Sequence, residues 1–217
     1  MRYELVIFDL DGTLLNTIGD LAEAANHMLR LRNLPEHDYA AYCTFVGNGI
    51  MRLVERALPE TWRTTEQVAA ARADFLAYYI DHIDRYTKPY EGIPTLLATL
   101  QAQGVRLAVA SNKFQAGTEK LIRGFFPEIH FEEIFGQRPD VPLKPDPAVV
   151  EEILAKTAVA RDRVLYVGDS GVDMLTAHAA RVRGVGVSWG FRSREELQAA
   201  AADRIIDHAE ALLEEWA

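Results

Sequence analysis

The sequence has little cysteine, no long hydrophobic run and too few cations to balance its acids. A single cysteine, Cys43, excludes an intramolecular disulfide and is typical of a reducing cytosol, so we expect a cytoplasmic location. No stretch approaches the ~18 apolar residues that a membrane helix needs, and the chain does not open on a signal-peptide pattern. The formal net charge of −9 disfavours nucleic acid and anionic membranes as partners. It is compatible with a small anionic substrate, because a local group of cations can offset the overall charge.

The hydrophobic pattern divides the chain into two kinds of segment. Its 217 residues suffice for one large domain, or for one domain that carries a second, smaller one. From about residue 18 to residue 85 the apolar residues follow helical spacing, without a convincing strand. The rest alternates strands and helices, which favours a parallel sheet with right-handed crossovers. We therefore predict an α/β core of residues 1–16 and 89–217, interrupted by a helical insert of residues 17–88 with hinge-like flanks.

Two carboxylates follow the first predicted strand. Residues 5–8 are apolar and predict a buried strand, and Asp9 and Asp11 come directly after it, before a turn that Gly12 permits. Ligands of open α/β sheets bind outside the carboxyl ends of the strands. Two like charges this close are costly to bury unless a cation neutralises them, and Mg²⁺ prefers such hard oxygen ligands. Taken alone, the pair could equally cap a turn and the next helix.

Two further polar motifs lie just beyond later strands or before helices. Ser111, Asn112 and Lys113 follow a predicted strand, and their hydroxyl, amide and backbone N–H groups are typical of an anion-binding turn. Lys144 stands before two prolines that stiffen its loop, where a compact ammonium group can bind a phosphate. An N-cap serine and a solvated lysine are the ordinary structural explanations of these motifs taken singly.

A second pair of acids follows the strongest predicted strand, residues 164–167. Asp169 and Asp173 are four residues apart, which on a helix would place both carboxylates on one face, toward one ion. Acids in the first turn of a helix are also favourable on electrostatic grounds alone. Each motif has an ordinary structural explanation on its own. The four together are harder to explain in that way, since all fall where the carboxyl ends of parallel strands would meet.

The order of these motifs resembles that of the haloacid dehalogenase superfamily of phosphohydrolases, and the resemblance spans the chain. The motifs read Asp-x-Asp-Gly-Thr, Ser-Asn-Lys, Lys-Pro-x-Pro and Gly-Asp-Ser-x-x-Asp. Residues 46–49, 53–58 and 88–90 are similar to segments of its phosphoglycolate phosphatase group. The resemblance implies a doubly wound parallel sheet of strand order 5-4-1-2-3, with the insert as a helical cap. Ser111, Phe114 and Arg181 depart from the residues frequent in relatives, which are Thr, Pro and Gly.

The resemblance also implies an activity: Mg²⁺-dependent hydrolysis of a phosphomonoester, most simply 2-phosphoglycolate, through an aspartyl-phosphate. Asp9 would be the nucleophile and Asp11 the general acid and base. Mg²⁺ would be held by the Asp9 side chain, the Asp11 backbone carbonyl and Asp169, while Asp173 would orient a bound water or Lys144. The phosphoryl oxygens would be held by Ser111, Asn112, Lys144 and Thr13. In the insert, the turn at residues 46–49 with Asn48, and Arg52, are the candidates for contacting the rest of the substrate.

Several alternatives share these motifs. The same fold could act on a sugar phosphate, a nucleotide or pyrophosphate, or could be a phosphomutase. A regulatory protein that binds phosphate without turnover is the alternative from another class, although the intact acids disfavour it. Metal-free dehalogenases of the superfamily do not keep the second aspartate, so Asp11 speaks against them. We expect a small phosphorylated metabolite as partner, and a monomer or a homodimer.

Overall fold

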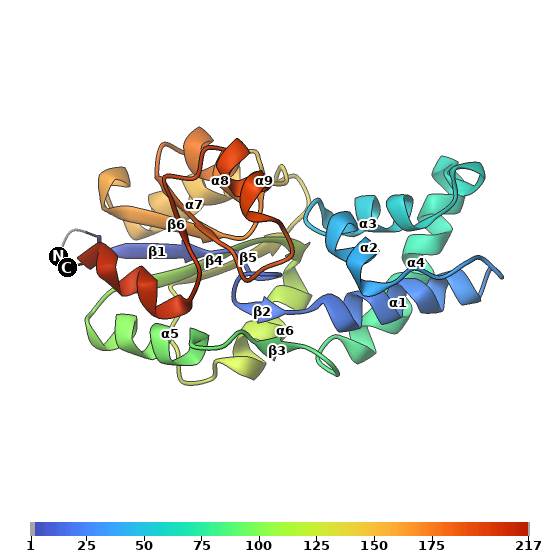
Figure 1. The fold of residues 1–217 in the computed structure, drawn as a ribbon, viewed down its shortest axis with the longest axis horizontal. Helices are drawn as coiled ribbons and strands as arrows, with labels where there is room; N and C mark the ends of the chain where they lie inside the picture. Colours follow the sequence, from blue (N-terminus) through green and yellow to red (C-terminus); the bar gives the residue numbers. More distant parts are fainter. Residues whose placement is uncertain (1–2, 217) are drawn as a thin grey trace.

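The computed structural model describes residues 3–216, so residues 1, 2 and 217 of the predicted core lie outside the described residues (Figure 1). Its centre is a six-stranded, all-parallel sheet of order β5-β4-β1-β6-β7-β8. Numbered along the chain, these six strands run 6-5-4-1-2-3, so β8 adds a strand beside the expected order. The strands are β1 Leu5–Phe8, β4 Arg106–Phe114, β5 Glu133–Gln137, β6 Val164–Gly168, β7 Arg183–Val187 and β8 Arg204–Ile206.

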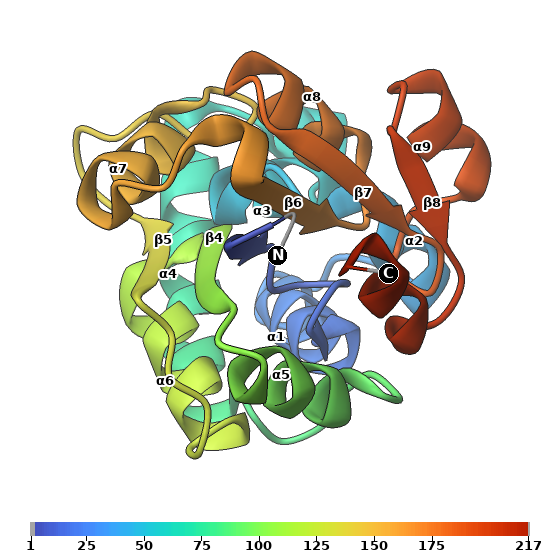
Figure 2. The same ribbon diagram turned by 90° about the vertical axis from the view of Figure 1, so that its left-hand side faces the viewer.

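Both faces of the sheet are covered by helices, which is why the central strand β1 is apolar and buried on both faces. Leu5 and Ile7 pack on one face, against α7 (Ala148–Thr157) and α8 (Gly171–Ala179). Val6 and Phe8 belong to the cluster on the other face, which includes α5 (Ile93–Ala102), α6 (Gln115–Phe125) and the 3₁₀ helix η3 (Ala209–Trp216). Figure 2 shows α7 and α8 on one side of the sheet and α5 and α6 on the other. The predicted doubly wound α/β architecture is confirmed.

A group of helices lies beyond the carboxyl end of β1 (Figure 1). As predicted, it contains no strand: it consists of α1 Ile18–Arg30, α2 Tyr39–Phe45, α3 Gly49–Ala57, η1 Glu60–Trp62 and α4 Thr65–His82. The segments predicted as hinges pair with each other, since β2 (Leu15–Asn16) and β3 (Lys88–Pro89) form an antiparallel ribbon. Buried Asp20 adds to this junction by accepting hydrogen bonds from Thr87 N–H and O–H, at 2.8 and 2.7 Å. The domain boundaries at 16/17 and 88/89 stay a prediction.

Some element ends differ from the sequence-based expectation. Strand β4 continues through Ser111, Asn112 and Lys113, with a shift of register before Phe114, so these residues belong to a strand and not to a turn. Helix α7 begins at Ala148, with Pro147 at its N-cap. The remaining elements are η2 (Arg161–Arg163) and α9 (Arg194–Ala199), and the Ser193 side chain caps α9. Within residues 3–216 we find no helix both long and apolar enough to span a membrane.

Candidate active site

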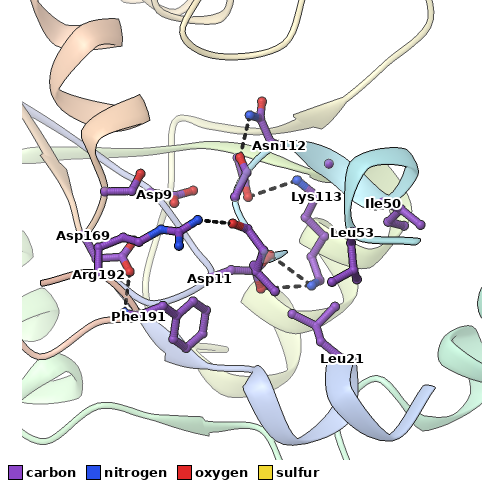
Figure 3. A pocket seen from close by; sticks show the side chains of 15 residues that line it. Asp9, Asp11, Leu21, Ile50, Leu53, Asn112, Lys113, Asp169, Phe191 and Arg192 are labelled. Atoms are coloured by element: carbon purple, nitrogen blue, oxygen red, sulfur yellow. Dashed lines mark hydrogen bonds and ion pairs between the residues drawn. The ribbon is translucent and has the colours of Figure 1, made fainter. Parts of the chain in front are cut away.

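The carboxyl ends of β1, β4 and β6 border a cavity that is partly open to solvent, with an empty space of about 560 Å³ when that open solvent is included. Helices α1 and α3 form the opposite wall, where Leu21, Ile50 and Leu53 present apolar side chains (Figure 3). The polar part of the wall comes from the sheet side and from the loop after β7. It comprises Asp9, Asp11, Ser111, Asn112, Lys113, Asp169, Ser170 and Arg192. The cavity therefore has one charged wall and one apolar wall.

Three buried carboxylates meet at the charged side. Asp9, Asp169 and Asp173 each offer an oxygen, and these oxygens lie within 4.8 Å of one another. Burial raises the pKa of Asp9 to about 7, with Asp173 and Asp11 adding to the rise and Lys144 opposing it. Burial, followed by the charges of Asp173 and Asp9, also holds the pKa of Asp169 well above its ordinary value. Hard oxygen donors whose negative charges are only partly compensated fit a divalent metal ion.

Asp169 reaches this cluster from the turn between β6 and α8, outside the helix. Ser170 is the N-cap of α8 and forms a capping box with Asp173, whose Oδ2 accepts from Ser170 Oγ at 2.6 Å. The prediction that Asp169 and Asp173 share one helix face was therefore wrong, although their carboxylates do converge. Gly12, at φ +87°, permits this packing, because a Cβ there would lie 2.2 Å from Asp169 Oδ2. The Phe191 N–H donates to the same oxygen at 2.7 Å.

Lys144 is the main counter-charge of the cluster. Its Nζ lies 2.9 Å from Asp9 Oδ1 and 2.8 Å from Asp173 Oδ1, and it donates to Tyr166 Oη at 3.0 Å. Burial opposes its charge, but Asp173 and Asp9 outweigh that cost and hold the pKa of Lys144 above its ordinary value. Among the described residues, Lys144 is not part of the cavity wall. The expected phosphate contact is thus less direct than predicted, because the ammonium is engaged with two acids.

Asp11 is held by a lysine to which the sequence analysis assigned no separate role. Lys113 Nζ lies 2.9 Å from Asp11 Oδ1 and 3.2 Å from Oδ2, and the Thr17 hydroxyl donates to Oδ1 at 2.7 Å. The Lys113 side chain is 2% exposed and passes over the ring of Tyr79 from α4, at 4.9 Å. The Ser-Asn-Lys motif could have indicated this contact. Neighbouring side chains of a strand point to different sides, so the lysine of the motif need not act together with the residue before it.

The polar side chains expected to bind phosphoryl oxygens are placed differently from one another. Ser111 lines the cavity, and its Oγ accepts from Lys113 N at 3.2 Å, which leaves its proton free to donate. Asn112 donates to Gly47 O at 2.9 Å and to Lys144 O at 3.1 Å, so its amide ties three segments together. The Thr13 hydroxyl is buried without a hydrogen-bond partner among the described residues, and Thr13 lies off the cavity wall.

Of the candidates from the insert, the turn at residues 46–49 lines the cavity as expected, through Val46, Gly47 and Gly49, whereas Asn48 and Arg52 lie outside the cavity wall. Asn48 Oδ1 accepts from Arg56 Nη2 at 2.8 Å, and Arg52, with 62% of its side chain exposed, pairs with Glu55 at 2.5 Å. The reason is the phase of α3, whose apolar face with Ile50 and Leu53 points to the cavity and turns Arg52 away. Arg192, from the loop after β7, lines the cavity instead, and no sequence motif singled it out.

Arg52→Ala is expected to leave catalysis nearly unchanged, because the side chain contacts Glu55 and solvent and does not reach the cavity. An exposed ion pair of this kind contributes at most about 1 kcal/mol to stability. Steady-state kinetics should give a KM within about twofold of the unchanged protein, since no contact with the cavity is lost. A KM tenfold higher would mean that Arg52 moves into the site during turnover.

Comparison with known proteins defines the class. The profile of haloacid dehalogenase-like hydrolases matches residues 6–187, and the chain belongs to this family. The chain is 34% identical to a phosphoglycolate phosphatase of Mesorhizobium japonicum, an alignment that covers 100% of this chain and 96% of the relative. A crystal structure of a protein from Lactobacillus delbrueckii subsp. bulgaricus has a TM-score of 0.93 at 32% identity, covering 99% of this chain and 98% of that one. A predicted phosphoglycolate phosphatase from Haemophilus somnus has a TM-score of 0.91 at 29% identity, covering 100% and 99%.

Proposed function

We propose that this protein is a Mg²⁺-dependent phosphomonoester hydrolase that acts on 2-phosphoglycolate through an aspartyl-phosphate on Asp9. The observation that carries the proposal is the cluster of Asp9, Asp169 and Asp173 at the carboxyl ends of the strands, with Lys144 against it and Asp11 nearby. The likeness to relatives named phosphoglycolate phosphatase supports the choice of substrate. We place such an enzyme in the cytoplasm, where its phosphorylated substrate would be found.

The reaction is divided between two aspartates. A carboxylate oxygen of Asp9 forms a bond to phosphorus while the ester P–O bond breaks, and Asp11 donates its proton to the leaving oxygen. Asp11 then takes a proton from the water that attacks the phosphorus of the aspartyl-phosphate, which releases phosphate and restores Asp9. Lys144, at 2.9 Å, orients the nucleophile, and Lys113 together with Thr17 orients Asp11.

The acid cluster would hold the metal ion. We assign Asp9, Asp169 and the Asp11 backbone carbonyl as ligands, with Asp173 acting through its contact with Lys144 or through a bound water. When bound, Mg²⁺ supplies positive charge that reduces the repulsion between Asp9 and the phosphoryl oxygens. Of the donors expected for those oxygens, we propose Ser111 as the direct one, because it lines the cavity with its hydroxyl proton free. The Asn112 amide is engaged by Gly47 O and Lys144 O, and Lys144 and Thr13 lie off the cavity wall, so these three would reach the oxygens only after a rearrangement.

Residues 17–88 would act as a cap that excludes water and selects the substrate. Two observations support this role. Helices α1 and α3 form the apolar wall of the cavity, and Asn112 of the core contacts Gly47 of the inserted segment. Low water access strengthens the electrostatic interactions of the site and limits side reactions.

Trapping of the intermediate tests the proposal directly. Borohydride reduces an acyl phosphate to an alcohol, so treatment during turnover of 2-phosphoglycolate should convert Asp9 into homoserine in the peptide that carries it. Asp9→Asn protein treated in the same way should show no reduced residue. Efficient turnover without reduction at residue 9 would argue that water attacks the ester directly.

Mg²⁺ should stabilise the fold more strongly at high pH than at low pH. The pKa of Asp9 is about 7 in the folded state against an ordinary 3.8, so the folded protein keeps a proton that the unfolded chain releases between these values. Without metal, the contribution of Asp9 to the free energy of unfolding therefore falls as the pH rises from 3.8 to about 7. Mg²⁺ competes with that proton and restores the loss.

Thermal denaturation with and without Mg²⁺ at about pH 5 and about pH 8 measures this effect, because the two conditions lie on either side of the Asp9 transition. At Mg²⁺ a hundred times its Kd and about pH 8, we expect the Tm to rise by about 5–10 °C. The rise should be smaller at the lower pH. Asp169→Asn is the matched variant and should lose most of the rise; an equal rise in both proteins would exclude Asp169 as a ligand.

A further inference from the structure

Two cations line the cavity within the described part of the chain, Lys113 and Arg192, and they differ in how they are paired. Lys113 is neutralised by Asp11 at 2.9 Å. Arg192 Nη2 donates to the backbone oxygens of Val46 and Thr44, at 2.6 and 3.2 Å, and both acceptors are neutral. The Arg192 guanidinium therefore brings positive charge to the cavity wall without a strong acidic partner.

The acid nearest to Arg192 is already engaged elsewhere. Glu196 Oε1 lies 3.7 Å from Arg192 Nε, but the same oxygen accepts from Gly171 N at 3.0 Å, and 44% of the Glu196 side chain is exposed. A guanidinium has five N–H donors in a planar fork. No described residue accepts a hydrogen bond from Arg192 Nη1, so Nη1 remains available for a ligand.

The position of Arg192 links the acid cluster to the insert. Its neighbour Phe191 donates to Asp169 through the backbone N–H (Figure 3). The Arg192 side chain itself donates to the backbone oxygen of Val46, which belongs to the insert. Gly47 lies beside the guanidinium, where a Cβ would make an ordinary contact with Nη2 at 3.6 Å; its φ of +114° is what favours glycine there. A small ester bound at Asp9 would extend toward this guanidinium.

The charges of the site point the same way. Lys113 and Lys144 pair with acids of the site, and a divalent ion would offset much of the remaining acid charge. The opposite wall, with Leu21, Ile50 and Leu53, offers no cation to a second anionic group of a ligand. Arg192 is then the group able to meet that second charge.

We propose that Arg192 binds the carboxylate of a short phosphorylated carboxylic acid and thereby sets the specificity of the site. The inference rests on the proposed function. Arg192 can donate to this carboxylate through Nη1 in a charge-assisted hydrogen bond, while Nη2 stays on the oxygens of Val46 and Thr44 and holds the side chain in place. The residue acts on the end of the substrate remote from phosphorus, so its loss should change discrimination between substrates more than the chemistry.

The test compares 2-phosphoglycolate with its neutral amide isostere, in which the carboxylate is replaced by a carboxamide. The unchanged protein should prefer the acid in kcat/KM by about 10- to 100-fold, the range expected of a hydrogen bond to a charged group. Arg192→Ala should reduce the preference to about one, mainly through a higher KM for the acid, with little change for the amide. Arg192→Lys keeps the charge and should retain part of the preference.

Arg194→Ala is the matched control, since Arg194 lies two residues away and pairs with Asp207 at 2.5 Å, away from the cavity wall. It should keep the full preference for the acid.

Equal loss on both substrates in Arg192→Ala would make Arg192 a link between core and insert, and would overturn the proposal. So would an unchanged protein that hydrolyses acid and amide equally well, an outcome that leaves the phosphatase function standing. Hydrolysis of neither ester would instead refute the proposed function, and the inference with it. If Arg192→Ala does not fold, Arg192→Lys decides: an undiminished preference at an unchanged KM contradicts a contact that depends on the guanidinium Nη1.

Discussion

Asp9→Asn is expected to lower turnover of 2-phosphoglycolate by about 10⁴- to 10⁶-fold, the loss typical of removing a nucleophile that forms a covalent intermediate. An amide nitrogen or oxygen at this position cannot form the aspartyl-phosphate, whereas the rest of the site stays in place. Phosphate release under saturating substrate measures the effect. Asp162→Asn is the matched control, because Asp162 is exposed on η2, before the amino end of β6, and should have normal activity.

The folded state should survive the Asp9→Asn change. Burial raises the pKa of Asp9 to about 7, so a neutral side chain of the same shape avoids a cost that the carboxylate pays. Lys144 loses one counter-ion but keeps Asp173 at 2.8 Å. A folded Asp9→Asn protein with a tenth or more of normal turnover would contradict the assignment of Asp9 as nucleophile.

Asp11→Asn is expected to slow the hydrolysis of an alkyl phosphate by about 10²- to 10⁴-fold, the usual contribution of a general acid and base. The loss should depend on the leaving group. A phenolic phosphate such as p-nitrophenyl phosphate expels an already stable anion and needs little protonation, so its first step should be slowed far less. Single-turnover kinetics on both esters separates formation of the aspartyl-phosphate from its hydrolysis.

The hydrogen bonds around Asp11 supply a control for this variant. Lys113 and Thr17 both bind the carboxylate, and Lys113→Met removes the ion pair without removing the proposed acid. Lys113→Met should retain the dependence on the leaving group, at a lower overall rate. Identical losses on alkyl and phenolic esters in Asp11→Asn would show that Asp11 acts only through its charge or its contacts.

The sequence was sufficient to predict the sheet and the meeting of the acids. Parallel strands bring their carboxyl ends to one edge, so Asp9 after β1 and Asp169 after β6 had to lie close once both strands were recognised. Lys144 is on a loop that does not directly follow such a strand, so the prediction that it lies near Asp9 depended on the family resemblance. The β2–β3 pairing involves only two residues of each strand, too few for periodicity to reveal.

The part of the site contributed by the insert could not be predicted in the same way. Helical spacing shows which face of α3 is apolar, but it does not show that this face meets the cavity and turns Arg52 to solvent. Arg192 follows a strand in a loop with no distinctive residues, so only the three-dimensional contact with Val46 identifies it. Asp169 was expected on a helix, yet the Ser170 cap starts α8 two residues later.

The central claim is that the acid cluster hydrolyses a small phosphomonoester with Mg²⁺, and a phosphate-release assay tests it most directly. The panel would contain 2-phosphoglycolate, a hexose phosphate, a nucleotide and pyrophosphate, with and without Mg²⁺, beside the Asp9→Asn protein. We predict Mg²⁺-dependent release concentrated on 2-phosphoglycolate and absent from Asp9→Asn. Release from the other esters instead would retain the chemistry and refute the substrate. No release from any compound by the folded protein would contradict the account and favour a protein that binds phosphate without turnover.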